Sequence, residues 1–406
     1  MAKQLQLRRG TTAEHSSFTG AVGEITVDTT KDTVVVHNGS TAGGTPLATE
    51  AYVATKADSA TTLAGYGITD AYTKTDVYTK TEVNNKPTGF KNYIINGGFD
   101  VWQRGVSQTS SGYGSADRWS FVNSGTSTRT INQTIATDTD RPYFNASKIL
   151  GITLTALDEY NSGRGIRHGQ SIEDVTRLAG KTVTLSFWAR ATTAMPIETT
   201  MQQIFGSGGS PSSAVSGIGA TRHQLTTSWQ KFTTTFTVPS IVGKILGTDG
   251  VHTSYTNCKF HLMADSATVV SEGLTGILQP PNGTIVFIAQ VQLEEGSVAT
   301  PFEQRPYGLE LSLCQRYYQR YPSFVVSGFV GGNASGITHD ITYPLNEVMR
   351  VSPSISVNGG WALLNAGNNG INANSSNNMV RIHTGVTTPN VGYYAVAYDV
   401  ILSAEL

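Results

Sequence analysis

The sequence is short of cysteine, of charge and of long apolar runs. Its 406 residues include only two cysteines, Cys258 and Cys314, which excludes a disulfide framework and a four-thiolate zinc site. Lys and Arg number 28 against 29 for Asp and Glu, so no excess of one sign indicates a nucleic-acid partner. No apolar run approaches the ~18 residues of a membrane span, and the charged N-terminus lacks the apolar segment of a secretory signal. We expect synthesis in a cytoplasm, without membrane insertion.

The chain nevertheless has enough apolar residues to fold. Hydrophobic residues make up 38% and aromatic residues 9%, which suffices for packed cores and argues against global disorder. Charged residues make up only 14%, whereas a soluble protein usually has about 25%. At about 100 to 200 residues per domain, the length predicts two to four domains.

Apolar and polar residues alternate with a period of two through most of the chain, between turns rich in Gly, Asn, Asp and Pro. This pattern predicts half-buried strands, so the predicted fold class is all-β. Near the N-terminus, Ile25 and Val27 share one face before a turn, and Val34 and Val36 share one face after it, which predicts a hairpin. In the segment KTVTLSFWARA, residues 183, 185, 187 and 189 share an apolar face. For residues 92–306, a β-sandwich of jelly-roll type fits best.

Residues 51–88 have a different character, rich in Thr, Ala and Tyr. They contain the tandem repeat YTKTDV and YTKTEV, whose period of six favours an extended repeat over a coiled coil. A short helix over residues 55–64, stopped at Gly65, fits the same stretch. A segment so rich in small residues cannot bury its own apolar face, and association with identical copies is the simplest remedy.

One helix is predicted, in YGLELSLCQRYYQRY between Pro306 and Pro322. Its residues Leu309, Leu313 and Tyr317 follow at a spacing of four and would face either a trimer axis or the protein's own sandwich. The last hundred residues return to strands, interrupted by residues 361–378, whose Asn, Gly and Ser predict an exposed loop.

Several segments resemble parts of bacteriophage tail fibres. LRRGTTAEHSSFTGAVGEITVDTTKDTVVVHNG is similar to the N-terminal segment of many phage fibres and of the phage major tropism determinant. AGYGITDAYTKTDVYTKTEV resembles repeats of long and short tail fibres. YIINGGFDVWQRG and ADRWSF, with QVQLEEGSVATPFEQRP, resemble a carbohydrate-binding-module-like domain of phage structural proteins, and YPLNEVMRVSPSISV resembles a strand of a fibre tip.

The resemblance implies an elongated homotrimeric fibre in the virion, synthesised in the host cytoplasm. Residues 1–48 would form a β-rich domain attached to the tail or baseplate, and residues 49–91 a thin repeat shaft. Residues 92–306 would form the jelly roll, and residues 307–406 a short helix and a C-terminal β-sandwich tip. The tip would meet a bacterial cell-surface polysaccharide or outer-membrane receptor. Low charge suits such a fibre, because identical side chains meet on its axis.

The sequence carries no clear signature of catalysis, cofactor binding or metal binding. G-x-S-x-G and H-E-x-x-H motifs are absent, and Glu294 and Glu295 would point to opposite faces of a strand. His252, Cys258 and His261 are close in sequence, but strand alternation separates Cys258 from His261. We therefore expect no enzyme, no cofactor and no metal site.

Sugar binding requires an aromatic platform and a few amide or carboxylate groups. The favoured receptor-binding set lies in the last fifty residues, where loops on a rigid scaffold often carry recognition: Trp361, Asn365, Asn368, Asn369, Asn372, Asn374, Tyr393 and Tyr394. The alternative glycan-binding set lies in the central domain: Trp102, Arg104, Asp117 and Trp119.

Three functions fit these observations. The first is a tail fibre that mediates host recognition and adsorption. The second is a tail fibre or tailspike that also depolymerises its polysaccharide receptor, which would need two carboxylates roughly 5 to 10 Å apart. The third is a structural connector that carries a separate tip protein. We favour the first.

Overall fold

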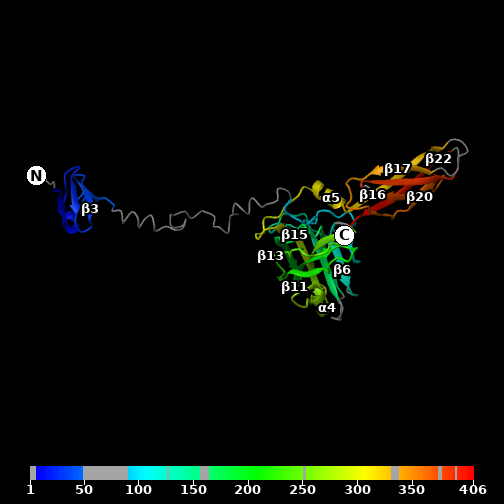
Figure 1. Ribbon diagram of the computed structural model, residues 1–406, viewed down its shortest axis with the longest axis horizontal. Helices are drawn as coiled ribbons and strands as arrows, with labels where there is room; N and C mark the ends of the chain where they lie inside the picture. Colours follow the sequence, from blue (N-terminus) through cyan, green and yellow to red (C-terminus); the bar gives the residue numbers. More distant parts are fainter. Residues whose placement is uncertain are drawn as a thin grey trace. The chain divides into compact units, whose positions relative to one another are not determined.

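The computed structural model describes the protein in eight stretches of chain. The chain divides into two compact units, Met1–Asn85 and Lys86–Leu406 (Figure 1). Strands make up most of the regular structure, so the all-β prediction is confirmed. Nearly all of the predicted shaft, residues 49–91, lies outside the described residues, and the boundaries at residues 48, 91 and 306 remain predictions. The described residues are 6–48, 90–125, 128–155, 164–249, 253–330, 338–373, 377–388 and 391–406.

The first unit contains a sheet of four strands in the order β1-β2-β3-β4, drawn in blue in Figure 1. The predicted hairpin is confirmed, because Ile25 pairs with Val36 and Val27 pairs with Val34. Its elements are β1 (Arg8–Gly10), α1 (Thr12–Ser16), β2 (Ile25–Asp28), β3 (Thr33–Val36) and β4 (Thr45–Pro46).

The buried face of this sheet carries polar side chains around the buried Val35. The Thr26 hydroxyl lies 2.8 Å from Nε2 of His15 and 2.9 Å from Nε2 of His37, and all three side chains are buried. The opposite face carries Ile25 and Val36, which are 44% and 36% exposed. The hydrogen-bonded histidines thus occupy the inner side, and the apolar side of the hairpin lies open among the described residues of this unit.

The second unit begins with a β-sandwich, as predicted for this region. A six-stranded sheet in the order β13-β10-β15-β8-β7-β5 packs on a five-stranded sheet in the order β12-β11-β14-β9-β6. All the strand pairs within the two sheets are antiparallel. The strands are β5 (Ser107–Gln108), β6 (Ser120–Ser124), β7 (Thr128–Ile135), β8 (Lys148–Thr155), β9 (Gly165–Glu173), β10 (Thr182–Ala191), β11 (Met195–Phe205), β12 (Val215–Leu225), β13 (Gln230–Thr237), β14 (Ser254–Ala264) and β15 (Ile285–Glu295).

The sandwich core follows the predicted alternation. Val183, Leu185, Phe187 and Ala189 of β10 are all buried in it. The core also contains a histidine: the ring of His168 stacks on Trp119 with centroids 5.2 Å apart and an angle of 6° between the planes. Burial lowers the pKa of His168 to about 3, so the ring is neutral in the folded protein at neutral pH.

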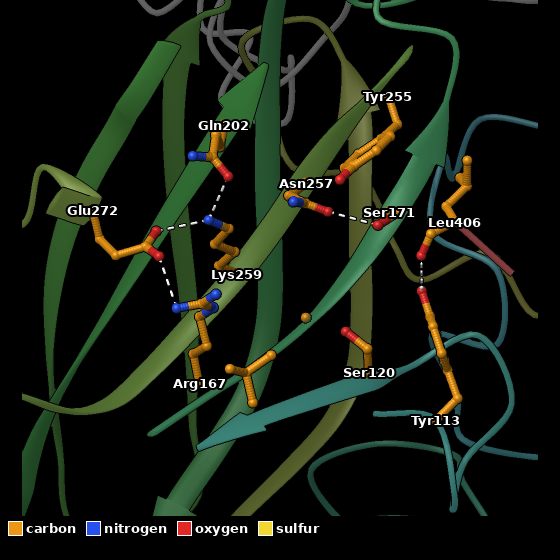
Figure 2. A pocket seen from close by; sticks show the side chains of 12 residues that line it. Tyr113, Ser120, Arg167, Ser171, Gln202, Tyr255, Asn257, Lys259, Glu272 and Leu406 are labelled. Atoms are coloured by element: carbon orange, nitrogen blue, oxygen red, sulfur yellow. Dashed lines mark hydrogen bonds and ion pairs between the residues drawn. The ribbon is translucent and has the colours of Figure 1, made fainter. Parts of the chain in front are cut away.

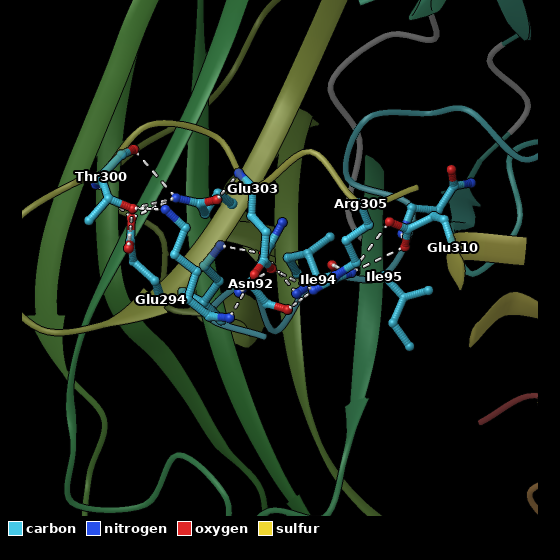
Figure 3. Close-up of polar contacts among 12 residues, drawn as sticks. Asn92, Ile94, Ile95, Glu294, Thr300, Glu303, Arg305 and Glu310 are labelled. Atoms are coloured by element: carbon cyan, nitrogen blue, oxygen red, sulfur yellow. Dashed lines mark hydrogen bonds and ion pairs between the residues drawn. The ribbon is translucent and has the colours of Figure 1, made fainter. Parts of the chain in front are cut away.

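A polar network ties the beginning of this unit to the end of the sandwich (Figure 3). The Glu303 carboxylate accepts a hydrogen bond from the main-chain N–H of Asn92 at 3.0 Å and pairs with Arg305 at 3.1 Å. Arg305 also donates to the carbonyl oxygens of Asn92 and Ile94 and pairs with Glu310 at 3.2 Å. Because these side chains are largely buried, the network holds the two ends of the sandwich together.

The predicted helix is shorter than its sequence pattern indicates. Helix α5 (Tyr307–Gln315) ends before the expected stop at Pro322, because the chain from Tyr318 joins a long strand instead. Pro322 has no partner in the register of that strand, as expected of a residue without an N–H group. The helix packs on its own sandwich through Glu310, which accepts a hydrogen bond from the N–H of Asn96 at 2.5 Å.

The C-terminal part of the unit consists of two sheets that share one hydrophobic core. One sheet has the order β16-β22-β18, with β19 also paired to β22, and the other has the order β17-β21-β20. The strands are β16 (Tyr318–Val330), β17 (Thr338–Pro344), β18 (Ser354–Val357), β19 (Trp361–Leu364), β20 (Ala366–Ala373), β21 (Met379–Val386) and β22 (Val391–Ser403).

The prediction of an exposed loop over residues 361–378 is wrong for most of that tract. It forms β19 and β20, in spite of its Asn and Gly residues. Trp361 pairs with Ala397, and Ile371 pairs with Ile382, so each strand is fixed by a partner with a buried side chain. Pairing with neighbours outweighs the weak strand propensity of the tract.

Candidate functional site

A polar groove lies on the outward face of the five-stranded sheet. Alternation along β9 directs Arg167 and Ser171 outward, while Ile166 and His168 enter the core. The same alternation on β14 directs Asn257 and Lys259 toward the groove (Figure 2). The cavity has a volume of about 310 Å³, at the lower end of the range for small-molecule sites, ~300–1,000 Å³. The described residues that line it are Tyr113, Ser120, Val122, Arg167, Gly169, Ser171, Gln202, Tyr255, Asn257, Lys259, Glu272 and Leu406.

Three charged side chains form one side of the groove. Glu272 is the last residue of helix α4 (Ser266–Glu272), which begins at the capping residue Asp265 and ends at Gly273 in a left-handed conformation. The Glu272 carboxylate pairs with Lys259 at 2.7 Å and with Arg167 at 2.8 Å. Burial disfavours the charge on Glu272, but the two cations outweigh it and hold the pKa of this carboxyl below its usual value. Burial lowers the pKa of Lys259, and Glu272 opposes that change.

The other side of the groove carries uncharged hydrogen-bonding side chains. The Ser171 hydroxyl donates to Oδ1 of Asn257 at 2.6 Å, and the Tyr113 hydroxyl donates to a main-chain oxygen of Leu406, the last residue, at 3.2 Å. On the charged side, Nζ of Lys259 donates to Oε1 of Gln202 at 2.6 Å. The groove thus offers amide, hydroxyl and cationic groups, which suit a ligand rich in hydroxyls. Glu272 is the one carboxylic side chain among its described lining residues.

The alternative set predicted in the central domain lies in and beside the core. Trp119 is buried, and its Nε1 donates to the carbonyl oxygen of Asn96 at 3.0 Å. Trp102 packs against the core and donates from Nε1 to the carbonyl oxygen of Phe99 at 2.6 Å. Burial raises the pKa of Asp117 to about 6. In this structure Trp119 presents no open ring face, and the glycan-binding role of the set remains a prediction.

The fourth member of that set, Arg104, belongs to a buried clamp on the C-terminal segment. The Glu405 carboxylate pairs with Arg104 at 2.6 Å and with Arg118. The guanidinium of Arg118 lies 3.4 Å from the ring centroid of Tyr317. Glu405 therefore joins the C-terminal sheets to the sandwich.

The distal set is not gathered on one surface. Tyr393 is buried, whereas its neighbour Tyr394 points to the exposed face of β22. Trp361 is half-buried and packs against the C-terminal core. Asn365 donates from Nδ2 to the carbonyl oxygen of Gly392 at 2.9 Å. Asn369 and Asn372 belong to β20 of the other sheet.

Two members of the distal set cannot be placed. Asn374 lies outside the described residues, and so does the side chain of Asn368. The receptor-binding role of the set as a whole remains a prediction.

The charged residues of the groove were missed from the sequence. Arg167 and Lys259 lie far apart along the chain and meet because β9 pairs with β14. Glu272 joins them only through the helix that follows β14. The local sequence contains no clear signal, because GIRHGQS has polar residues in both alternating sets, Arg167 and Ser171 in one and His168 and Gln170 in the other.

The described residues contain no group of three or more His, Cys, Asp and Glu side chains that could hold a metal ion. Cys258 and His261 do point to opposite faces of β14, as predicted: Cys258 packs in the core, and Nε2 of His261 contacts the Thr200 hydroxyl at 2.9 Å. His252 lies outside the described residues. In the same stretches, no helix is both long and apolar enough to cross a membrane.

Two parts of the chain match known families. Residues 5–41 match the family described as "Major tropism determinant N-terminal domain", and residues 156–246 match the family described as "Carbohydrate binding domain". The "Tail fiber receptor-binding protein" of Bordetella phage BPP-1 is 62% identical over 55 residues. That match covers 14% of this chain and 14% of the relative, so the chain spans about one seventh of the relative's length.

Two solved structures are similar to part of this chain. The N-terminal cellulose-binding domain of Cellulomonas fimi β-1,4-glucanase C is 18% identical, covering 38% of this chain and 82% of that chain with a TM-score of 0.25. The enzymatically active domain of tailspike protein 4 from bacteriophage CBA120 is 13% identical, covering 50% of this chain and 21% of that chain with a TM-score of 0.29.

The family matches confirm the resemblance stated from the sequence. The N-terminal segment is similar to that of a phage tail fibre receptor-binding protein, and the central domain is similar to carbohydrate-binding domains. Together they support a phage tail fibre with a carbohydrate-binding-like domain.

Proposed function

We propose that this protein is a virion tail fibre that recognises a bacterial surface glycan and mediates adsorption to the host, without cleaving its receptor. The observation that carries the proposal is an open polar groove on a domain that matches carbohydrate-binding domains, in a chain whose N-terminal segment matches a tail fibre receptor-binding protein. The N-terminal unit attaches to the tail or baseplate, and the groove binds sugar hydroxyls. The exposed sheet face around Tyr394 in the C-terminal part makes a second contact with the receptor.

The proposed fibre is a homotrimer, and the first unit supplies the support for it. One face of its sheet carries apolar side chains from both strands of the hairpin, and Ile25 and Val36 of this face are exposed. Monomeric proteins rarely leave contiguous apolar faces open to water. Packing this face against the same face of two further copies removes it from water.

A charge on this face should break the trimer. We expect the wild-type chain to have three times the mass of one chain in light scattering, and the Ile25→Asp variant to be monomeric, because a carboxylate would be buried without a partner. Val22→Asp is the matched control, since Val22 is 82% exposed and lies outside the strands. A monomeric wild-type chain, or equal dissociation of both variants, would contradict the trimer.

Host binding tests the function itself. We expect the labelled full-length protein to bind host cells, and Ser120→Trp to abolish most of this binding, because the indole would fill the groove that Ser120 lines. Ser124→Trp on the same strand is the control, since Ser124 is absent from the lining. Tyr394→Ala should weaken binding by less than Ser120→Trp.

The outcomes of the host-binding test separate the proposed roles. Full binding of host cells by Ser120→Trp would show that the groove is not the receptor-binding site. Full binding by Tyr394→Ala would show that the sheet face around Tyr394 makes no second contact with the receptor. Failure of the wild-type chain to bind would favour a structural connector. Release of reducing sugar ends from host polysaccharide would show that the fibre also depolymerises its receptor.

A further inference from the structure

We infer that the glycan bound in the groove carries an anionic group, a carboxylate or a phosphate, and that Arg167 and Lys259 bind this group. The inference rests on the proposed function of the groove and names the class of sugar that the groove selects. It is carried by the charge of the lining residues, by their partial burial and by the scarcity of aromatic rings at the site.

The groove holds more positive than negative side-chain charge. Among the described lining side chains, Arg167 and Lys259 are cations and Glu272 is the single carboxylate. This leaves one positive side-chain charge in excess around Glu272, while the main-chain end at Leu406 lies on the other side of the groove beside Tyr113. Burial raises the pKa of both lining tyrosines, Tyr113 and Tyr255, so neither phenol offsets that charge at neutral pH.

Arg167 has hydrogen-bonding capacity left for a ligand. Its Nη1 pairs with Oε1 of Glu272, but a guanidinium has five N–H donors, and this side chain is 30% exposed. In Figure 2 the guanidinium lies beside Lys259, with Ser171 and Asn257 farther across the groove. A planar carboxylate or a phosphate can accept two parallel hydrogen bonds from such a group.

Partial burial strengthens the attraction. The side chains of Lys259 and Glu272 are only 7% and 10% exposed, and charge interactions are stronger where water is largely excluded. Beside Arg167 and Lys259 one carboxylate, that of Glu272, faces two cations. An anionic group on the ligand would bring a second negative charge to this side of the groove.

The groove offers a neutral sugar little aromatic surface. Neutral pyranoses usually stack on an exposed aromatic ring, and the described lining has no tryptophan or phenylalanine. Its two aromatic residues are Tyr113, whose hydroxyl is engaged with Leu406, and Tyr255. Selectivity therefore rests on charge, with Asn257, Gln202 and Ser171 left to contact sugar hydroxyls.

The test compares forms of one polysaccharide. The surface polysaccharide is purified from a bacterial strain whose cells bind the full-length protein, and portions of it are carboxyl-reduced or dephosphorylated. Calorimetric titration of the full-length protein should show affinity at least about tenfold weaker for the form that has lost its anionic group, the effect expected for one charge-assisted hydrogen-bonded contact. Which treatment weakens binding identifies the group as carboxylate or phosphate.

A pair of variants connects the effect to the groove. Arg167→Gln should lower the affinity for the untreated polysaccharide about tenfold and leave the affinity for the neutralised form nearly unchanged. Arg222→Gln is the matched control, because it removes the same charge from β12 of the same sheet, outside the lining. Circular dichroism checks that both variants fold.

The inference and the proposed function fail in different ways. Equal affinity for the untreated, carboxyl-reduced and dephosphorylated polysaccharides would overturn the inference and leave glycan binding intact. If Arg167→Gln lowered the affinity for the neutralised polysaccharide as much as it lowers the affinity for the untreated one, the inference would also be overturned. Absence of binding to every form would contradict the proposed function itself.

Discussion

Replacing Glu405 with Gln is expected to lower the free energy of unfolding of the Lys86–Leu406 unit by about 3–5 kcal/mol, the usual cost of removing one partner from a buried ion pair. Glu405 is the carboxylate that pairs with both Arg104 and Arg118. The Arg118 side chain is only 1% exposed, so it cannot turn to water for compensation. The Gln side chain keeps the size of Glu but leaves two buried cations without their charge partner.

The measurement is urea unfolding of the full-length protein, followed by tryptophan fluorescence. Asp399→Asn is the control, because it removes one carboxylate from an ion pair in the same C-terminal part, that of Arg320 and Asp399, which lies at the surface. We expect little change there, since exposed ion pairs contribute little to stability. Equal effects of the two substitutions would show that the Glu405 clamp does not hold the C-terminal sheets to the sandwich.

Acidification is expected to destabilise the sandwich through its buried histidines, and His168 gives the sharpest test. Burial lowers the pKa of His168 to about 3 in the folded protein, whereas an unfolded histidine titrates near pH 6.5. Between these values the unfolded chain binds the extra proton, so stability is lost as the pH falls below about 6.5. The loss amounts to about 1.4 kcal/mol per pH unit, or about 3 kcal/mol by pH 4.

His168→Leu should remove the part of this pH dependence that is due to His168. Neither ring nitrogen of His168 has a hydrogen-bond partner among the described residues, so a leucine of similar size should leave the protein at least as stable at neutral pH. Urea unfolding of wild type and variant at pH 7, 6, 5 and 4 compares the two slopes. Parallel slopes would mean that His168 is not buried as a neutral ring. Burial also lowers the pKa values of His223 and His261, to about 4 and about 3. Substituting these two histidines tests their share of the pH dependence in the same way.

Strand alternation predicts much of this fold. The positions of β10 that enter the core and the shared faces of the N-terminal hairpin follow directly from it, because a strand places every second side chain on one face. Alternation could not say which face of the hairpin is inner. Thr26 takes the inner side because two histidines, distant in sequence, bond to its hydroxyl.

Two local patterns failed where pairing between distant strands decides the structure. The helical spacing after Pro306 continues to Tyr317, but β16 pairs with β22 from Tyr318 onward and shortens the helix. The Asn- and Gly-rich tract after Trp361 lacks strand propensity, yet β19 and β20 gain partners in β22 and β21.

The groove was beyond prediction for the same reason. Arg167, Lys259 and Glu272 have ordinary sequence surroundings, and they meet only through the pairing of β9 with β14 and through the helix that follows β14. Of the five aromatic residues that did attract attention, Trp119 and Tyr393 are buried, Trp102 and Trp361 are half-buried, and Tyr394 alone is exposed. An aromatic side chain with polar neighbours is as typical of a core as of a sugar platform.

The central claim is that the groove on the five-stranded sheet binds the glycan of the host surface. Titration of purified host surface polysaccharide into the full-length wild-type protein and into Ser120→Trp tests it most directly. We predict that the wild type binds and that Ser120→Trp, folded as judged by circular dichroism, loses most of this binding. Binding of equal affinity by both proteins would contradict the claim.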